Sequence, residues 1–229
     1  PYGPPTCDAP AATLAASGNV FDFSTAGGFV EGATIEVLEH PGLQAVTDDG
    51  GAFAFEALPA GGPLTFTMQH PDYPPYQSRT FHSCDEDLTH VSIQAPDDEV
   101  FELMSTFAQT EADPERCQIA TTVTRLDGSL YDPEGGSHGE EGATVSIWPA
   151  VDAELGPIYF DLVSPTVIYP NRQLTETTED GGVLFVNLPP GEYWLDADKE
   201  GVEFTPVFVG CRAGWLANAS PPWGLNPVE

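Results

Sequence analysis

Short runs of this chain carry apolar residues at alternate positions, and turns rich in Gly, Pro and Asp separate the runs. A period of two places successive side chains on opposite faces, as in a half-buried β-strand. The clearest runs are residues 19–23, 33–38, 52–55, 64–68 and 88–93. Short strands at this spacing predict an all-β sandwich of about seven strands.

The period changes once, after Pro96. Asp97 is a suitable N-cap, and apolar residues then recur at the i, i+3, i+4, i+7 spacing of one helical face. These residues are Val100, Leu103, Met104 and Phe107. The pattern predicts a helix of about twelve residues that ends by residues 110–114. Because an apolar stripe is normally buried, we expect the helix to pack against one or both sandwiches.

The chain repeats its turn and strand motifs once. Residues 31–35 (EGATI) return as 141–145 (EGATV), and residues 47–51 (TDDGG) return as 178–182 (TEDGG). Both copies then reach a Leu-Pro-x-Gly turn, at residues 58–61 and 188–191. The repeat predicts two tandem sandwiches of ordinary domain size. Their expected bounds are 1–96 and 117–229, with a helical linker at 97–116.

The second copy differs from the first by an insert near residues 148–176. The insert lengthens the segment between the matched motifs by about twenty residues and is rich in apolar side chains, Tyr159 among them. We expect it to form an extra hairpin. Such a hairpin either packs on its own domain or provides a surface for a partner.

Two cysteines flank each copy, which predicts one disulfide bond per module. Four cysteines allow three pairings, and the repeat favours Cys7–Cys84 and Cys117–Cys211. Disulfides persist in oxidising compartments, so we predict a secreted or cell-surface protein, with the periplasm as an alternative. No run of apolar residues reaches the length of about 18 needed for a transmembrane helix.

The charge is strongly negative, with 36 Asp and Glu against 6 Lys and Arg and a formal net charge of −30. Nucleic acids and anionic lipids are bound through Lys and Arg, so neither is an expected partner. The acidity suits a soluble protein in a salty medium, where self-repulsion is screened. Alternatively, acidic loops bind calcium; none has EF-hand spacing, so we assign no calcium site and no other cofactor.

The repeated motifs resemble those of carboxypeptidase regulatory-like domains. The matching segments are 32–37, 47–55, 58–61 and 73–81 in the first copy, and 142–147, 178–186 and 188–195 in the second. The resemblance implies two transthyretin-like or Ig-like sandwiches of seven strands each. It also implies an accessory or structural role in secreted and cell-surface proteins, without activity of its own. The first copy departs from the family by having residues 71–73 (PDY) where a Gly-Tyr pair is usual, and the second by its insert.

Motifs of enzyme chemistry are incomplete. His138 and Glu141 have the HxxE spacing of half a zinc site, but no third ligand is evident nearby. The five His residues form no HxH or HxxxH pair, and no Ser lies in a nucleophile elbow. We therefore predict that the protein is not an enzyme and has no catalytic, metal-binding or cofactor-binding residues.

Aromatic residues outside the repeated motifs are the best candidates for contact with a glycan or a protein partner. All four Trp lie in the second module or its tail. The candidates are Tyr73, Tyr76, Trp148, Tyr159, Trp215 and Trp223. We expect Trp194 in the core instead, because it lies on an alternating strand.

The leading hypothesis is a non-enzymatic structural or adhesive protein that acts through contacts with a protein partner or with itself. The Pro-rich ends, residues 1–10 and 219–229, are the segments expected to add to a neighbour's sheet edge and assemble a fibre. The alternative hypothesis is a carbohydrate-binding accessory module. A metalloenzyme on a transthyretin-like fold is the third.

Overall fold

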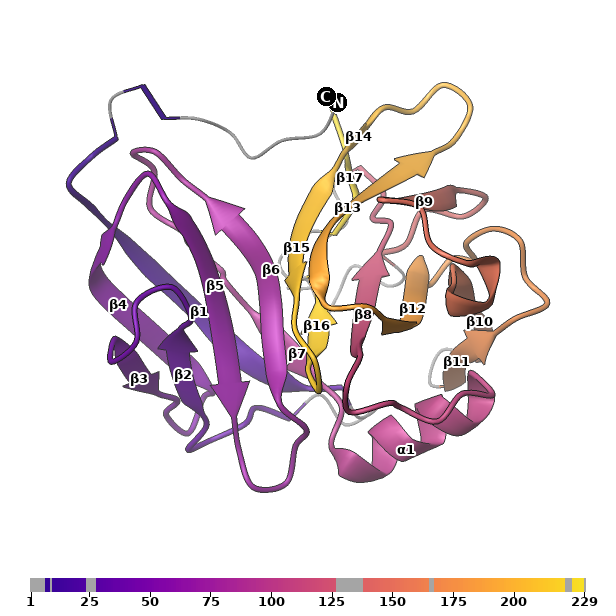
Figure 1. The fold of residues 1–229 in the computed structure, drawn as a ribbon, viewed down its shortest axis with the longest axis horizontal. Helices are drawn as coiled ribbons and strands as arrows, with labels where there is room; N and C mark the ends of the chain where they lie inside the picture. The colour runs from indigo at the N-terminus through magenta and orange to yellow at the C-terminus, as the bar shows by residue number, and fades with distance from the viewer. Residues whose placement is uncertain are drawn as a thin grey trace.

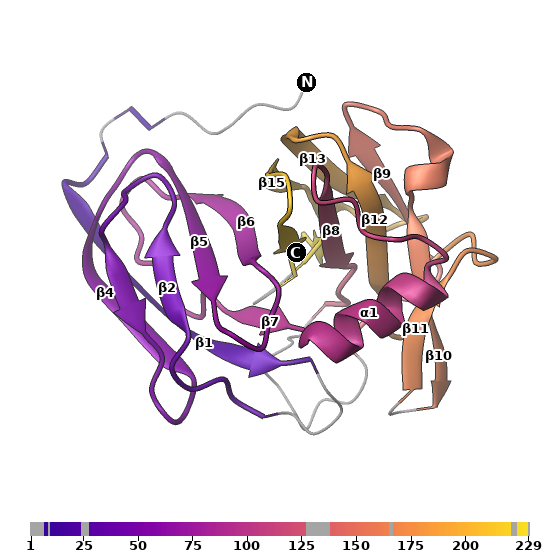
Figure 2. The same ribbon diagram turned by 60° about the horizontal axis from the view of Figure 1, so that its bottom comes forward.

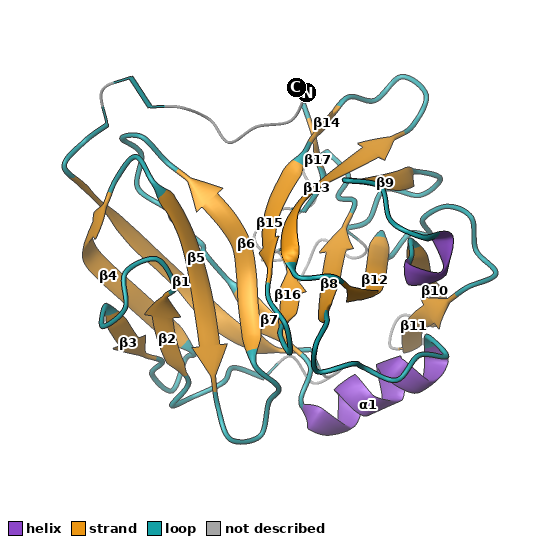
Figure 3. Ribbon diagram, viewed as in Figure 1, coloured by secondary structure: helices purple, strands orange, loops and turns teal. Residues whose placement is uncertain are grey.

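The computed structural model describes residues 7–8, 10–23, 28–126, 138–164, 167–220 and 224–228. The first repeat contains β1 (Thr13–Asp22), β2 (Thr34–Val37), β3 (Gln44–Val46), β4 (Ala52–Pro59), β5 (Pro63–Gln69), β6 (Tyr76–His82) and β7 (Ile93–Ala95), followed by α1 (Asp98–Phe107) (Figure 1). The second repeat contains β8 (Cys117–Thr122), β9 (Thr144–Trp148), the 3-10 turn η1 (Ala153–Leu155), β10 (Ile158–Ser164), β11 (Val167–Asn171), β12 (Gly182–Leu188), β13 (Gly191–Asp198), β14 (Phe204–Thr205), β15 (Val207–Cys211), β16 (Leu216–Asn218) and β17 (Asn226–Pro227). Strands dominate the molecule (Figure 3), which confirms the predicted all-β fold.

One large sheet runs through both repeats. Its nine strands have the order β11-β10-β12-β8-β16-β6-β5-β2-β3. The three-stranded sheet β4-β1-β7 packs against the half that comes from the first repeat, and β15-β13-β9 packs against the half from the second. Each repeat therefore forms a sandwich, and the two sandwiches have one sheet in common.

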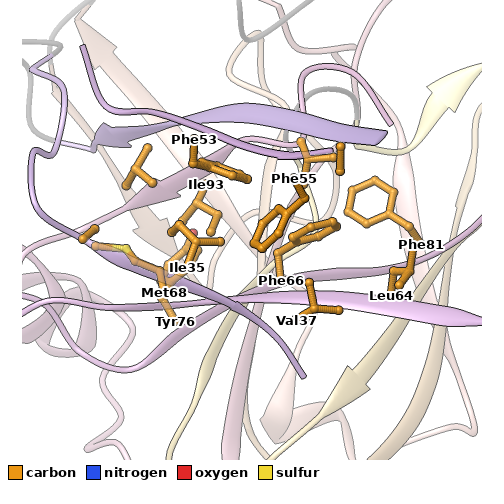
Figure 4. Close-up of a cluster of buried hydrophobic side chains, with 14 of the residues drawn as sticks. Ile35, Val37, Phe53, Phe55, Leu64, Phe66, Met68, Tyr76, Phe81 and Ile93 are labelled. Atoms are coloured by element: carbon orange, nitrogen blue, oxygen red, sulfur yellow. The ribbon is translucent and has the colours of Figure 1, made fainter. Parts of the chain in front are cut away.

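Alternating side chains of facing strands fill the first core. On β4, Phe53 and Phe55 point inward and meet Phe66 of β5, with ring centroids 6.3 Å and 5.9 Å apart (Figure 4). Phe81 of β6 completes the cluster at 5.9 Å from Phe66. Burial of each of these side chains stabilises the fold by roughly 1.5–3 kcal/mol.

The second core is built in the same way, and the insert extends its sheet. Ile119 of β8 and Phe185 of β12 face Leu195 of β13 across the sandwich, and all three are fully buried. The insert forms the predicted hairpin, β10 and β11, which pairs with β12 and so lengthens the nine-stranded sheet. The hairpin packs on its own domain rather than projecting from it.

At the turn that includes Thr47, the residues that are equivalent in the structure are offset by one position from the residues matched in the sequence. Thr47 Oγ1 accepts a hydrogen bond from Ala33 N (2.9 Å) and donates one to the Val30 carbonyl (2.7 Å). In the second repeat Thr177, not Thr178, makes these bonds, to Ala143 N (2.9 Å) and the Glu140 carbonyl (2.5 Å). The match of TDDGG with TEDGG was therefore wrong by one position, because the buried threonine and not the acidic pair fixes the turn.

The helix begins and ends as predicted, but it buries a different face. Asp97 caps it by accepting a hydrogen bond from Val100 N at 2.8 Å. Met104 and Ala108 pack against the cluster formed by Ile158, Phe160, Leu184 and Val186. Leu103 and Phe107 of the predicted stripe are 50% and 41% exposed. The covered face is rotated because α1 runs across the junction from the end of β7 towards β11 (Figure 2).

Strand β16 joins the two repeats directly. It is parallel to both of its neighbours, β6 of the first repeat and β8 of the second. Leu216 N donates to the Pro75 carbonyl at 3.0 Å, while Gln118 N donates to the Trp215 carbonyl at 3.1 Å. Leu216 packs in the first core and the next residue, Ala217, in the second. The linker helix is thus not alone in connecting the described parts of the two sandwiches.

Both predicted disulfides are present, Cys7–Cys84 and Cys117–Cys211, with sequence separations of 77 and 94 residues. In the chain-entropy model each contributes at most about 4–5 kcal/mol. Among the described residues, no helix is long and apolar enough to cross a membrane.

The described part of the C-terminal tail is docked on its own module. Leu225 is fully buried, and β17 pairs with β14, where Val228 N donates to the Glu203 carbonyl at 2.8 Å. The expectation that residues 219–229 form a free end for strand exchange is therefore wrong for the described residues, because Ala219, Leu225 and Pro227 are already buried in cis and β17 is already paired. Most of the N-terminal segment and Trp223 lie outside the described residues.

Candidate functional site: an aromatic row on the outer sheet

The outer face of the sheet β15-β13-β9 carries an unusual set of side chains. Along β13, Tyr193 and Leu195 point into the second core. Alternation places Glu192, Trp194 and Asp196 on the opposite face, which points away from that core. The central strand of this sheet therefore presents a tryptophan between two carboxylates.

The strand register extends Trp194 into a row of aromatic rings. Trp194 lies opposite Phe208 of β15 on one side and Trp148 of β9 on the other. The Trp194 and Phe208 ring centroids are 5.1 Å apart, with planes inclined at 43°. His82 of β6 continues the line, 5.6 Å from Phe208. We call these four residues the aromatic row.

The aromatic row has one exposed end, at Trp148. His82, Phe208 and Trp194 are half-buried, whereas Trp148 is 53% exposed. Burial lowers the pKa of His82, and the nearby carboxylates of Glu39 and Glu192 oppose this effect without cancelling it. The His82 ring is therefore neutral at pH 7, and the net charge of the region comes from the acidic residues.

Polar contacts between the repeats fix the inner end of the row. Gly210 N, on β15 two residues after Phe208, donates to Thr80 Oγ1 of β6 at 3.3 Å. The Thr80 and Thr65 hydroxyls are 2.8 Å apart, and Thr65 Oγ1 donates to Glu39 Oε1 at 2.7 Å. This chain of hydrogen bonds attaches β15 of the second repeat to the sheet of the first.

A second set of contacts lies one step further along the same strands. Gln77 Nε2 donates to the Gly210 carbonyl, and Arg212 Nε donates to Gln77 Oε1 at 3.1 Å. The Arg212 guanidinium also lies 3.6 Å from the Trp215 ring centroid. Gln77 is fully buried and uses both ends of its amide in these bonds, which holds the two surfaces in a single arrangement.

A groove of about 410 Å³ lies beside the exposed end of the row. Its walls are residues 149–152, Leu155 and residues 189–193, so Glu192 borders both the groove and the aromatic row. The groove is lined mostly by prolines and apolar side chains, together with the carboxylates of Asp152 and Glu192. Glu192 thus links the outer face of β13 to the groove, whose other walls include Val151, Leu155 and Tyr193 at the margin of the second core.

Two of the predicted contact residues are core residues instead. Tyr76 is 1% exposed and donates to the Gln94 carbonyl, and burial raises its pKa well above the usual range. Tyr159 is 3% exposed, and its hydroxyl accepts a hydrogen bond from Val145 N at 3.0 Å. Their assignment as glycan or partner contacts was wrong, because each ring fills a core and uses its hydroxyl internally.

The other predicted contact residues lie on different parts of the surface. Tyr73 is half-buried and donates to Asp22 Oδ2 at 2.8 Å, so its hydroxyl serves the first module. Trp215 is half-buried beneath Arg212 at the junction of the repeats. Trp148 alone among the described candidates belongs to the aromatic row.

Sequence reasoning missed Trp194 and Phe208. Trp194 was expected in the core because its strand alternates between inward and outward side chains. In the structure Tyr193 and Leu195 point inward, so Trp194 lies on the outward face. The residues two positions away, Glu192 and Asp196, are acidic, and this is the signal that places Trp194 on the polar face. Phe208 lies between the buried Val207 and Val209, so its outward position follows from the same alternation.

The described residues contain no group of three or more His, Cys, Asp or Glu side chains that could hold a metal ion. The calcium expectation therefore gains no site within the described chain. A separate apolar cavity of about 80 Å³ lies under α1, between Phe101, Met104, Phe160 and Leu216. It belongs to the junction between the repeats.

Comparisons with known proteins give distant structural likenesses. No family model and no curated protein matches the chain, so its membership of the carboxypeptidase regulatory-like class stays a prediction. A putative carbohydrate-binding protein from Bacteroides uniformis aligns at 11% identity and a TM-score of 0.32, over 88% of this chain and 98% of that one. A minor pilin of Streptococcus agalactiae aligns at 10% identity and a TM-score of 0.30, over 94% and 97%.

The Bacillus anthracis TIE protein aligns at 16% identity and a TM-score of 0.26. The alignment covers 90% of this chain but 34% of that protein, so the chain spans about a third of its length. TM-scores this low assign neither a family nor a function to the chain.

Proposed function

We propose that this is an extracellular, non-enzymatic protein with a structural or adhesive role, which it performs through protein–protein contacts. The observation that carries this proposal is β16, which lies between β6 and β8 and merges two sandwiches into one nine-stranded sheet. Backbone hydrogen bonds across a shared sheet oppose hinge motion between domains. Such a molecule presents its surfaces at fixed distances, as a structural or adhesive part requires.

The disulfides and the charge support an extracellular setting. Each repeat has its own bond, and both are of the kind that persists in an oxidising environment. The net charge of −30 favours a dispersed protein in a medium whose salt screens self-repulsion.

The structure offers a sheet edge for a protein contact. Strand β3 is the last strand of the nine-stranded sheet on the side of the first repeat. On and beside it, Val46 is 64% exposed and Leu43 is 37% exposed. An edge strand with exposed apolar residues is a site where another chain can add a strand.

We also propose the repeat units 1–96 and 117–229, with 97–116 as the linker, as the domains of this protein. Residues 216–218 are an exception to this division, since β16 contributes to both cores. We therefore expect the two units to depend on one another for full stability.

A charge at the edge tests the proposed contact. Val46→Lys places a cation on β3, and charged residues on edge strands block edge pairing. At high salt, where self-repulsion is screened, sedimentation velocity should show concentration-dependent association of the natural chain and reduced association of this variant.

Leu103→Lys is the matched control, because Leu103 is 50% exposed but lies on α1, which is not part of a sheet. The control should associate like the natural chain. A natural chain that stays monomeric at all concentrations, or a control that loses association equally, contradicts contact through β3.

A further inference from the structure

We propose that the aromatic row is the docking site for cationic side chains, Arg or Lys, of a basic polypeptide partner. This inference rests on the proposed function, because it gives the chemistry of the partner in a protein–protein contact. The bound cation would lie against Trp148 and Trp194, with Glu192 and Asp196 on either side.

The first argument is the nature of the rings. The face of a tryptophan is the side chain surface that attracts a cation most strongly, and Arg is the cation most often found there. Trp148 and Trp194 lie opposite each other on neighbouring strands, and Trp148 is 53% exposed. Tryptophan and tyrosine in this kind of setting are frequent anchors of protein interfaces.

The second argument is charge complementarity. Glu192 and Asp196 stand two residues before and after Trp194, so strand geometry puts them about 7 Å to either side of it on the same face. Asp198 follows at the next outward position and lies opposite Thr144. Within a chain of net charge −30, this face attracts a cationic partner from a distance and then holds it at close range.

The third argument is pre-organisation. Trp194 packs on Phe208, and the strand that carries Phe208 is tied to the first repeat through Gly210, Thr80 and Gln77. A side chain that is already held in place loses little conformational freedom when a partner binds. The adjacent groove of about 410 Å³ gives the flanking part of the partner polypeptide a place to lie.

The ring geometry favours a cation over a neutral glycan. A sugar chain stacks on aromatic rings that are exposed and coplanar, whereas the Trp194 and Phe208 planes are inclined at 43° and both rings are half-buried. A cation needs one ring face and a nearby carboxylate, and Trp148 with its neighbours provides both.

Isothermal titration calorimetry of the full chain with an oligoarginine peptide tests this proposal. Trp148→Ala and Trp194→Ala should each weaken binding by about tenfold, the loss expected when one cation–π contact is removed. Phe107→Ala, a partly exposed ring on α1, is the control for loss of an aromatic side chain and should leave the affinity unchanged.

The carboxylates are tested with matched amides. Glu192→Gln and Asp196→Asn should weaken peptide binding and reduce its dependence on salt, whereas Glu102→Gln on α1 should not. Equal thermal stability of each variant and the natural chain shows that the fold is retained.

Two results would overturn the proposal. In one, the peptide binds with the same affinity to the natural chain and to both Trp variants, so that diffuse negative charge alone holds it. In the other, a neutral oligosaccharide such as cellohexaose binds in a Trp148-dependent manner and the peptide does not, which assigns the row to a glycan.

The two proposals fail separately. Self-association through β3 without any effect of the Trp variants on peptide binding contradicts only the assignment of the aromatic row. Trp-dependent peptide binding by a chain that stays monomeric at all concentrations contradicts only the contact through β3.

Discussion

Two buried threonines hold the same turn in the two repeats. Thr47 and Thr177 are each at most 4% exposed, and each uses one hydroxyl both to accept a backbone N–H and to donate to a carbonyl. The turn that follows needs a glycine, Gly51 or Gly181, with φ of +66° or +73°. A Cβ on either glycine would lie within 2.5 Å of a backbone oxygen. The turn is thus fixed by the hydrogen bonds of a buried threonine and by a glycine at which any side chain would be strained.

Asp180 gives a prediction about pH. Burial raises the pKa of its carboxyl, although Gly182 N donates to it at 3.0 Å and partly offsets this effect. The folded state therefore holds the proton more tightly than the unfolded chain, and the stability contributed by this group falls as pH rises through the folded pKa. Asp180→Asn keeps a hydrogen-bond acceptor and removes the charge. Thermal melts should show a higher Tm for this variant at pH 7.

The gain should shrink as the pH is lowered towards about 4, where the carboxyl of the unfolded chain also takes up a proton. Asp49→Asn is the control and should change the Tm little, because Asp49 is exposed and lies in the equivalent turn of the first repeat. A gain at Asp180 that is the same at every pH would show that charge burial is not its cause.

At the scale of elements, the helix shows what periodicity can and cannot predict. Its existence, its N-cap at Asp97 and its approximate length follow from local sequence. The side that is buried depends on how the helix lies against the junction of the two repeats. A small rotation of the helix about its own axis is enough to bury one apolar stripe instead of the next. Met104 is common to the predicted and the observed face, whereas Leu103 is half exposed.

A pair of truncations tests the observed face of α1. Met104→Ala should lower the free energy of unfolding by about 1–2 kcal/mol, because it removes packing against the cluster around Phe160. Leu103→Ala should change it by less than about 0.5 kcal/mol, as exposed substitutions usually do. Chemical denaturation of both variants measures the difference. The opposite order of effects would restore the face predicted from periodicity.

The strands show the same division between local and long-range information. Alternation and turn residues predicted β2, β4 and β5, whereas the run at 88–93 is a strand only from Ile93 onward. The flanking cysteines predicted both disulfides. They could not predict β16, which has three residues and owes its place to partners from both repeats. The aromatic row was missed for a related reason. Its prediction requires knowing which residues of three strands lie opposite one another and on which face of the sheet each side chain lies.

At the scale of the whole molecule, the shared sheet changes the meaning of the repeat. Duplication by itself suggests two domains that fold and move separately. Here Leu216 and Ala217, adjacent in one strand, belong to different cores, and Gln77 and Thr80 of the first repeat hold Gly210 of the second. Loss of order in either repeat would expose buried surface in the other, so the two should unfold together.

Differential scanning calorimetry of the intact, oxidised chain tests this claim most directly. The structure predicts one transition whose van't Hoff and calorimetric enthalpies agree. At about 0.7 kcal/mol per residue near 60 °C, that enthalpy should be about 160 kcal/mol for the whole chain. Two separate transitions, or a van't Hoff enthalpy near half of the calorimetric value, would show that the repeats unfold independently and would contradict the account of a single rigid unit.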